Sequence, residues 1–314
     1  MPLHPFLQAL VDKANGLPPM SSVPVDKIRA GDLRRCSTGL PLEPIESSED
    51  LLIPGPRGQL RIRVYRPHLD ACTSSHPLPL TVFFHGSGFV ICSIETHDEM
   101  CRHLCQRSGS LVISVDYALA PEHPFPAAPN DCLASVQWVA ANAASLGGDP
   151  ARIALAGDSA GGNLATVTAA RLRDESPKIK LRAQLLLYPV TDHYSAGHPS
   201  YEERDKHCGL TRDDMVWFWH QYLRDPTLAA HPQVSPLRAV NLAGLPPTFI
   251  ATAEYDVLRD EGRAYGARLQ AAGVPTKIRH CADANHGFMF WVGLVNNASA
   301  AMNEAGAWLR DQLK

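Results

Sequence analysis

Short apolar runs alternate with longer segments of helical spacing along most of the chain. In the runs the apolar residues are nearly continuous, whereas in the longer segments they recur every three or four positions. This alternation is typical of an α/β fold, in which helices cover both faces of a mostly parallel central sheet. The predicted strands are residues 60–66, 80–85, 111–117, 152–156, 183–188, 248–253 and 276–281. The predicted helices are residues 97–106, 129–144, 160–174, 259–272 and 296–313.

Residues 191–245 break the alternation, because they contain no convincing strand. Within them the segment 215–223 is crowded with aromatic residues, and Thr211 ahead of Asp213 and Asp214 predicts an N-cap and an acidic first turn for a helix. Such a helix packs on the core. It also fits a cap over a substrate pocket, because an insertion between two late strands lies near the carboxyl edge of the sheet, where α/β sites form.

Composition indicates an ordinary globular protein, and an α/β chain of 314 residues often forms one domain, here residues 1–314. The net charge of −3 and the lack of a basic cluster argue against nucleic acid or an anionic membrane as partner. Eight cysteines, Cys72 among them, are scattered without a C-x-x-C pair, which favours reduced thiols in the cytoplasm. The sequence also lacks a signal-peptide pattern and a run of about 18 apolar residues, so we expect a cytoplasmic protein that does not span a membrane.

The most informative motif is Gly157-Asp158-Ser159-Ala160-Gly161-Gly162, which lies between a predicted buried strand and a predicted helix. In that context a G-x-S-x-G pattern forms a tight turn that lifts the serine oxygen above the sheet. Glycines suit the flanking positions, because side chains there would collide with the neighbouring strand and helix. The motif therefore makes Ser159 the candidate nucleophile.

A serine hydroxyl needs a base within hydrogen-bond reach and an acid that orients the base. In α/β hydrolases these groups follow the serine in the order Asp or Glu, then His. Asp256 follows the predicted strand 248–253, and His286 follows the predicted strand 276–281. Glu254, Asp260 and Glu261 are rival acids, but Glu254 lies tight against the strand and the other two begin a predicted helix. His280 lies inside a strand and is interpreted as structural.

The anionic tetrahedral intermediate of acyl transfer needs hydrogen-bond donors aimed at its oxygen. We expect one from the backbone N–H of Ala160, at the start of a helix whose dipole favours negative charge. The others are expected from the loop after the strand 80–85, which has the sequence His85-Gly86-Ser87-Gly88-Phe89. Its small residues let the backbone approach a ligand closely, and His85 is expected to brace this loop.

Four motifs together resemble the hormone-sensitive-lipase-like family of α/β-hydrolase carboxylesterases. They are His85-Gly86-Ser87-Gly88, residues 116–128, residues 157–163 and residues 256–261. The resemblance runs from about residue 40 to the C-terminus. It implies the α/β-hydrolase fold, a Ser159–Asp256–His286 triad, oxyanion donors on the backbone of Ser87, Gly88 and Ala160, and a cap formed by about residues 1–45 and 191–245.

Ser87 departs from the family, whose usual loop is His-Gly-Gly-Gly. Its N–H is retained, but a side chain at a glycine-like backbone angle costs about 1–2 kcal/mol. We therefore expect Ser87 to keep an ordinary conformation and to point its hydroxyl either away from the acyl oxygen or toward it.

The sequence predicts a serine carboxylesterase for short- to medium-chain acyl esters, with no cofactor and no metal. A metal at Cys101, His103 and Cys105 is disfavoured, because only two thiols share a helix face there. Two alternatives remain open: hydrolysis of amides, lactones or carbamates by the same residues, and a small-molecule receptor without catalysis. An exposed last strand also allows a homodimer. The candidate substrate-lining residues are Phe89, Tyr188, Phe218 and Phe288.

Overall fold

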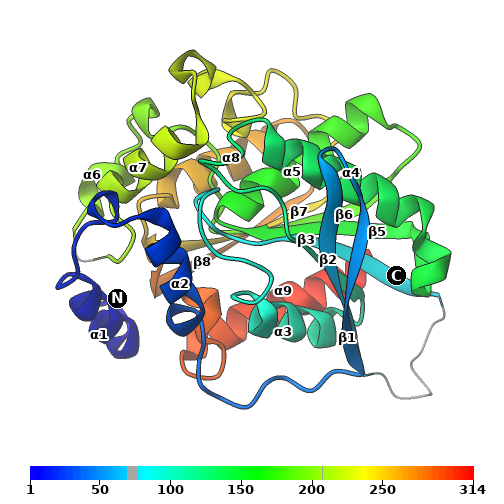
Figure 1. Ribbon diagram of the computed structural model, residues 1–314, viewed down its shortest axis with the longest axis horizontal. Coiled ribbons are helices and arrows are strands. Elements are labelled where there is room, and N and C mark those ends of the chain that lie inside the picture. The colour runs from blue at the N-terminus through cyan, green and yellow to red at the C-terminus, as the bar shows by residue number, and fades with distance from the viewer. Residues whose placement is uncertain (69–76, 207) are drawn as a thin grey trace.

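The computed structural model describes residues 1–68, 77–206 and 208–314, without the side chains of residues 33–35, so that Cys72 lies outside the described residues. Within these segments eight strands form one sheet in the order β1-β2-β4-β3-β5-β6-β7-β8 (Figure 1). β2 pairs antiparallel with β1 and β4, and all other neighbours are parallel. The strands are β1 (Ser47–Gly55), β2 (Gly58–Arg66), β3 (Leu78–Phe84), β4 (Leu111–Val115), β5 (Gly148–Asp158), β6 (Leu181–Leu187), β7 (Thr248–Tyr255) and β8 (Thr276–Asn285).

The sequence pattern missed β1, which is an edge strand. Most of its residues are exposed, and its sequence SSEDLLIPG has neither a continuous apolar run nor a regular alternation. β1 is held by a nine-residue register with β2, from Ser47 opposite Arg66 to Gly55 opposite Gly58. Main-chain pairing therefore defines this strand more than burial does.

Helices cover both faces of the sheet, as predicted, and each face has its own hydrophobic core. Met100 of α3 and Leu309 of α9 belong to one core, whereas Val136 of α4, Leu164 of α5 and Leu269 of α8 belong to the other. Figure 1 shows α3 and α9 below the sheet and α4, α5 and α8 above it. The bounds are α3 (Asp98–Ser108), α4 (Ala127–Ala141), α5 (Ala160–Glu175), α8 (Arg259–Ala271) and α9 (Asn296–Gln312).

The two segments expected to form a cap lie on the same side of the molecule in Figure 1. The first contains α1 (Pro5–Ala14) and α2 (Val25–Arg35), and the second contains α6 (Ser200–Glu203) and α7 (Arg212–Tyr222). α7 begins as predicted: the Thr211 hydroxyl accepts from the Asp214 N–H at 3.0 Å, and the Asp214 carboxylate accepts from the Thr211 N–H at 3.1 Å. The described residues of 191–245 contain no strand.

Both segments are bonded to the body of the protein near the ends of the strands. The Arg29 guanidinium of α2 donates to the Val90 carbonyl at 2.8 Å, and the Asp32 carboxylate accepts from the Cys92 N–H at 2.9 Å. From the other segment, the Cys208 carbonyl accepts from the Asn285 side chain at 3.1 Å. The first segment is therefore bonded to the loop after β3, and the second segment is bonded to the end of β8.

Candidate active site

Ser159 lies in a strained turn between β5 and α5. Its backbone angles are φ 51° and ψ −120°, a conformation that non-glycine residues rarely adopt. Its N–H donates to the Leu187 carbonyl at 2.8 Å, and its carbonyl accepts from the Val190 N–H at 3.1 Å, so the neighbouring strand end holds the turn on both sides. Gly161 is required here, because a Cβ on it would lie 1.9 Å from the Phe84 carbonyl oxygen.

Asp256 and His286 meet Ser159 at this edge of the sheet. The His286 Nε2 is 2.9 Å from the Ser159 Oγ, and the His286 Nδ1 is 2.8 Å from the Asp256 Oδ2. Asp256 is 1% exposed, and its other oxygen accepts from the Leu258 N–H at 2.9 Å, which fixes the carboxylate. Ser159 itself is 8% exposed. The three residues lie on the loops from which the sequence predicted them.

The rival acids have other partners. Glu254 pairs with Arg259 at 2.9 Å and with His280 at 3.1 Å. Glu261 is fully buried in α8 and accepts from the N–H groups of Thr191 at 2.7 Å and Asp192 at 3.2 Å. Burial raises the pKa of Glu261 well above its ordinary value of 4.5. Neither acid contacts His286.

The backbone N–H groups that the sequence proposed as oxyanion donors lie on the loop after β3 (Ser87 and Gly88) and at the first residue of α5 (Ala160). Within the part of the chain that the structure describes, the N–H groups of Ser87, Gly88 and Ala160 donate to no protein acceptor. The left-handed backbone angles of the loop fall on Gly88 (φ 53°) and Phe89 (φ 65°) and not on Ser87. Ser87 therefore has no glycine-like strain, and its hydroxyl points to the hydroxyl of Tyr117 at 2.6 Å.

His85 lies beneath this loop. Its ring stacks on Tyr117 at a centroid distance of 4.4 Å, and the Tyr117 hydroxyl donates to the His85 carbonyl at 2.6 Å. Burial lowers the pKa of His85 to about 3, so its ring is neutral at physiological pH. The ring is wholly buried and has no contact with Ser159, which is consistent with a brace for the loop.

The four candidate substrate-lining aromatic residues divide into two pairs. Phe218 of α7 lies against the loop after β3, because a Cβ on Gly88 would come within 2.3 Å of its ring, while the Phe89 ring stacks on Tyr222 at 3.9 Å. On the other side, the Tyr188 ring lies 4.9 Å from the His286 ring and 5.5 Å from the Phe288 ring. All four residues are buried.

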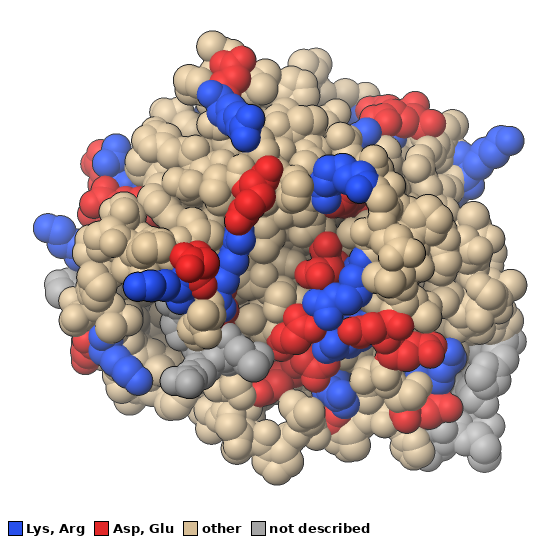
Figure 2. Space-filling model, in the orientation of Figure 1, with Lys and Arg blue, Asp and Glu red and all other residues tan. Residues whose placement is uncertain are grey.

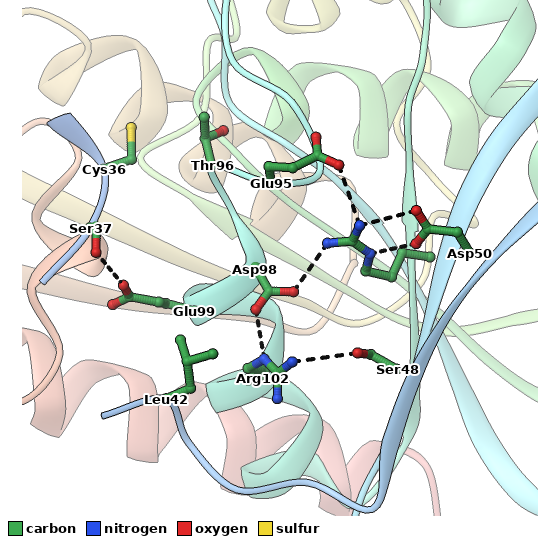
Figure 3. A pocket seen from close by; sticks show the side chains of 11 residues that line it. Cys36, Ser37, Leu42, Ser48, Asp50, Glu95, Thr96, Asp98, Glu99 and Arg102 are labelled. Atoms are coloured by element: carbon green, nitrogen blue, oxygen red, sulfur yellow. Dashed lines mark hydrogen bonds and ion pairs between the residues drawn. The ribbon is translucent and has the colours of Figure 1, made fainter. Parts of the chain in front are cut away.

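A charged pocket of about 690 Å³ lies apart from these residues, between residues 36–42, the β1–β2 pair and the N-terminal end of α3 (Figure 3). Figure 2 shows acidic and basic side chains interleaved on this face. Each lining carboxylate is hydrogen-bonded: Asp50 to Arg63 at 2.5 Å, Asp98 to Arg102 at 2.6 Å and Glu99 to Ser37 at 2.8 Å. Glu95 is bound by Arg61, whose hydrogen bond lowers the pKa of this carboxyl to about 2. The lining carboxylates are thus all held in a hydrogen-bonded network.

The structure also bears on metals and membranes. Among the described residues, no group of three or more His, Cys, Asp or Glu side chains could hold a metal ion. Cys101 and Cys105 are buried in the core, and His103 pairs with Glu43 at 3.0 Å. A search of the described helices finds none long and apolar enough to cross a membrane.

Comparison with known proteins assigns the family. Residues 81–290 match the family described as alpha/beta hydrolase fold. The chain is 42% identical over 271 residues to the carboxylic ester hydrolase LipN of Mycobacterium tuberculosis, covering 84% of this chain and 70% of LipN. It is 34% identical over 318 residues to an arylesterase of Saccharolobus solfataricus, covering all of both proteins. A solved hyperthermophilic esterase of the archaeon Pyrobaculum calidifontis superposes with a TM-score of 0.89 at 38% identity, over 99% of each chain.

The chain therefore belongs to the α/β-hydrolase family, in its hormone-sensitive-lipase-like group. With about 40% identity to esterases over most of its length, it is a carboxylic ester hydrolase. The predicted fold, family and enzyme class are confirmed.

Sequence reasoning missed a buried Asp–His pair beside the candidate triad. The Asp158 carboxylate accepts from the Gly86 N–H at 2.6 Å and lies 3.2 Å from the Nε2 of His97. Asp158 stands inside the serine motif, but His97 looks like the start of an ordinary helix. No pattern in the sequence indicated that these two residues, 61 positions apart, meet.

Proposed function

We propose that the enzyme is a serine carboxylesterase for short- to medium-chain acyl esters, with Ser159, His286 and Asp256 as its catalytic triad. The observation that carries this proposal is the continuous chain of hydrogen bonds from Asp256 through His286 to Ser159. An ionised carboxylate only accepts hydrogen bonds, so the contact with Asp256 places a proton on the His286 Nδ1 and leaves Nε2 free to accept the serine proton.

In the proposed reaction the Ser159 Oγ attacks the acyl carbon while the His286 Nε2 takes its proton. His286 then returns that proton to the leaving alcohol, and Asp256 stabilises the imidazolium that forms in between. Water, activated by the same Nε2, attacks the acyl-enzyme and frees the acid. The proposed reaction needs no cofactor or metal, because the nucleophile, the base and the oxyanion donors all come from the chain.

The N–H groups of Ser87, Gly88 and Ala160 are the proposed oxyanion hole. The proposal is supported by their positions, Ser87 and Gly88 on the loop after β3 and Ala160 next to Ser159, and by the fact that, among the described residues, these N–H groups donate to no protein acceptor. Ala160 also begins α5, so the positive end of a 16-residue helix faces the developing charge. Loss of one such donor costs about 10²- to 10³-fold in turnover in serine hydrolases.

Residues 1–45 and 191–245 are proposed to form a cap that limits the acyl chain. Phe218 supports this part of the proposal, because its ring lies against Gly88 beside the proposed oxyanion hole. Phe89, Tyr188 and Phe288 are proposed to complete the apolar lining around the nucleophile. A large ring at this position favours short chains, since a longer chain must displace it or pass around it.

A p-nitrophenyl ester series from acetate to laurate, assayed with the native enzyme and Ser159→Ala, tests the proposal. We expect activity to be highest at the short end and to vanish in the variant, with a loss of up to about 10⁶-fold. Phe218→Ala should move the optimum to longer chains. Phe125→Ala is the matched control. The Phe125 ring packs against Tyr222 at a centroid distance of 5.8 Å, so its removal should leave the chain-length optimum unchanged. Activity that survives in Ser159→Ala contradicts the assignment of the nucleophile.

The alternatives give different results in matched assays. An ester and an amide with the same acyl group distinguish an esterase from an amidase, and a lactone and a carbamate extend the comparison. A folded native protein that binds esters without hydrolysing any of them would instead support the receptor alternative.

We further propose a homodimer and a cytoplasmic location. β8 is an edge strand of the sheet, and its Ile278 is 38% exposed, which leaves an edge for pairing with a second copy. Light scattering of the purified protein tests the dimer, and a monomer at all concentrations contradicts it. The location rests on the scattered cysteines, and cell fractionation tests it.

A further inference from the structure

A buried charged pair lies directly behind the proposed nucleophile. Asp158, at the end of β5, is 2% exposed, and His97, the residue before α3, is fully buried. The His97 Nε2 is 3.2 Å from one Asp158 oxygen and 3.4 Å from the other. The triad does not use either residue.

The Asp158 carboxylate also fixes the oxyanion loop. It accepts from the Gly86 N–H at 2.6 Å, and a Cβ on Gly86 would lie 2.3 Å from its Oδ2, so the loop backbone rests on the carboxylate itself. The next two N–H groups along the chain are those of Ser87 and Gly88. The position of this carboxylate therefore sets the path of the two proposed oxyanion donors.

The hydrogen bonds around His97 indicate that both of its nitrogens carry protons. Nε2 faces a carboxylate, which accepts. Nδ1 is 2.8 Å from the Thr96 Oγ, whose own proton points to the Ser93 carbonyl at 2.8 Å. The Thr96 oxygen therefore offers a lone pair to Nδ1, and the ring is an imidazolium that neutralises Asp158.

The surroundings of His97 agree with this charge. The titratable groups that face it are Asp158, His85 and the thiol of Cys36, and the rings of Phe83 and Phe290 pack against it. Burial lowers the pKa of His97, but the Asp158 carboxylate outweighs burial, and the net effect is a pKa above the ordinary 6.5. His85 is neutral, so it does not compete for Asp158.

We propose that His97 is a positioning residue: its imidazolium anchors the Asp158 carboxylate, which holds the Gly86 N–H and thereby aims the oxyanion loop at the substrate. This role rests on the proposed function for its kinetic consequence. The oxyanion is absent from the bound substrate and forms only in the tetrahedral intermediate and its flanking transition states, so a displaced loop lowers kcat while ground-state binding, and hence KM, changes little.

The test is His97→Gln, which keeps a donor toward Asp158 but removes the charge. We expect kcat for p-nitrophenyl acetate to fall about 10- to 100-fold with KM within about twofold. Native kcat should also fall at alkaline pH, where His97 loses its proton, and His97→Gln should lack that fall. His103→Gln, on the same helix α3 but paired with Glu43 near the surface, is the matched control and should behave as the native enzyme.

A second measurement does not depend on catalysis, and its main readout comes from the native protein. Long-range ¹H–¹⁵N spectra of the native protein at pH 7 should show one buried histidine with both nitrogens protonated, and that signal should be missing in His97→Gln. A neutral His97 overturns the proposal. So does an unchanged kcat in a folded His97→Gln that is merely less stable. If the native enzyme hydrolyses no ester, the proposed function fails, and the spectra still decide the protonation state of His97.

Discussion

Ser87→Ala isolates what this serine, which stands where the family usually has glycine, does in the loop after β3. The Tyr117 hydroxyl donates to the His85 carbonyl, so the Ser87 hydroxyl donates to the Tyr117 oxygen at 2.6 Å and accepts from the Phe89 N–H at 2.8 Å. Phe89 has a left-handed φ of 65°, and its N–H bond to Ser87 helps to hold that strained conformation.

The expected loss of stability in Ser87→Ala follows from the hydrogen-bonding groups that lose their partner. Ser87→Ala leaves the N–H of Phe89, a residue only 1% exposed, without its hydrogen-bond acceptor. An unsatisfied buried donor lowers the free energy of unfolding by about 1–3 kcal/mol. With about 2.1 cal/mol/K of unfolding entropy per residue, a chain of 314 residues loses about 1.5–4.5 °C in Tm. Because the loop carries the proposed oxyanion donors, kcat should fall about tenfold as well.

Thermal unfolding followed by circular dichroism, with kinetics on p-nitrophenyl acetate, measures both effects. Ser87→Gly should lose as much stability as Ser87→Ala, since Ser87 is not in a glycine-favouring conformation. The control is Ser145→Ala, an exposed serine that donates to the Asn142 carbonyl, which should change stability by less than about 0.5 kcal/mol. A Ser87→Ala enzyme with native Tm and native turnover would contradict this role and make Ser87 a neutral replacement of glycine.

Three further changes have definite expected outcomes. Gly161→Ala should prevent folding or destabilise the protein by several kcal/mol, because its Cβ meets the Phe84 backbone; a folded, active variant in circular dichroism and ester assays contradicts this. Asp256→Asn should keep the fold and lower kcat by about 10⁴-fold, since the imidazole tautomer is no longer fixed, whereas a loss below tenfold in the p-nitrophenyl assay argues for another acid. The raised pKa of Glu261 makes its contribution to stability fullest below pH 4.5 and lost as pH rises toward the folded value. Glu261→Gln should therefore flatten the dependence of unfolding free energy on pH between 5 and 8 in urea titrations, and an unchanged slope would count against a protonated Glu261.

The fold was predictable where burial determines the sequence. The strands from β3 to β7 are buried for most of their length, so their apolar runs were visible, although polar residues hid the first part of β5 (Gly148–Asp158). β1 was not predictable, because backbone pairing at an edge leaves little trace in side-chain pattern. The predicted boundaries of the other strands differ by a few residues from those in the structure, because backbone pairing at strand ends also leaves little trace in the side-chain pattern.

The candidate triad was predictable from the positions of its residues after the strands. Parallel strands have their carboxyl ends at one edge of the sheet, and Asp256 and His286 each follow such a strand. The pairing of His97 with Asp158 was not, because contacts between distant loops leave no local pattern. The conformation of Ser87 could be seen only in the structure. The sequence raised the prospect of a left-handed, strained backbone at Ser87, but in the structure the left-handed angles lie at Gly88 and Phe89.

We propose that Ser159 is the nucleophile and that His286 activates it. The most direct test of this proposal is labelling with a p-nitrophenyl phosphonate ester, followed by intact-mass measurement and peptide mapping of the native enzyme, Ser159→Ala and His286→Ala. We expect one adduct per native chain, on the peptide containing Ser159, none in Ser159→Ala and much slower labelling in His286→Ala. An adduct on another residue, or labelling of Ser159 at the native rate without His286, would contradict the proposal.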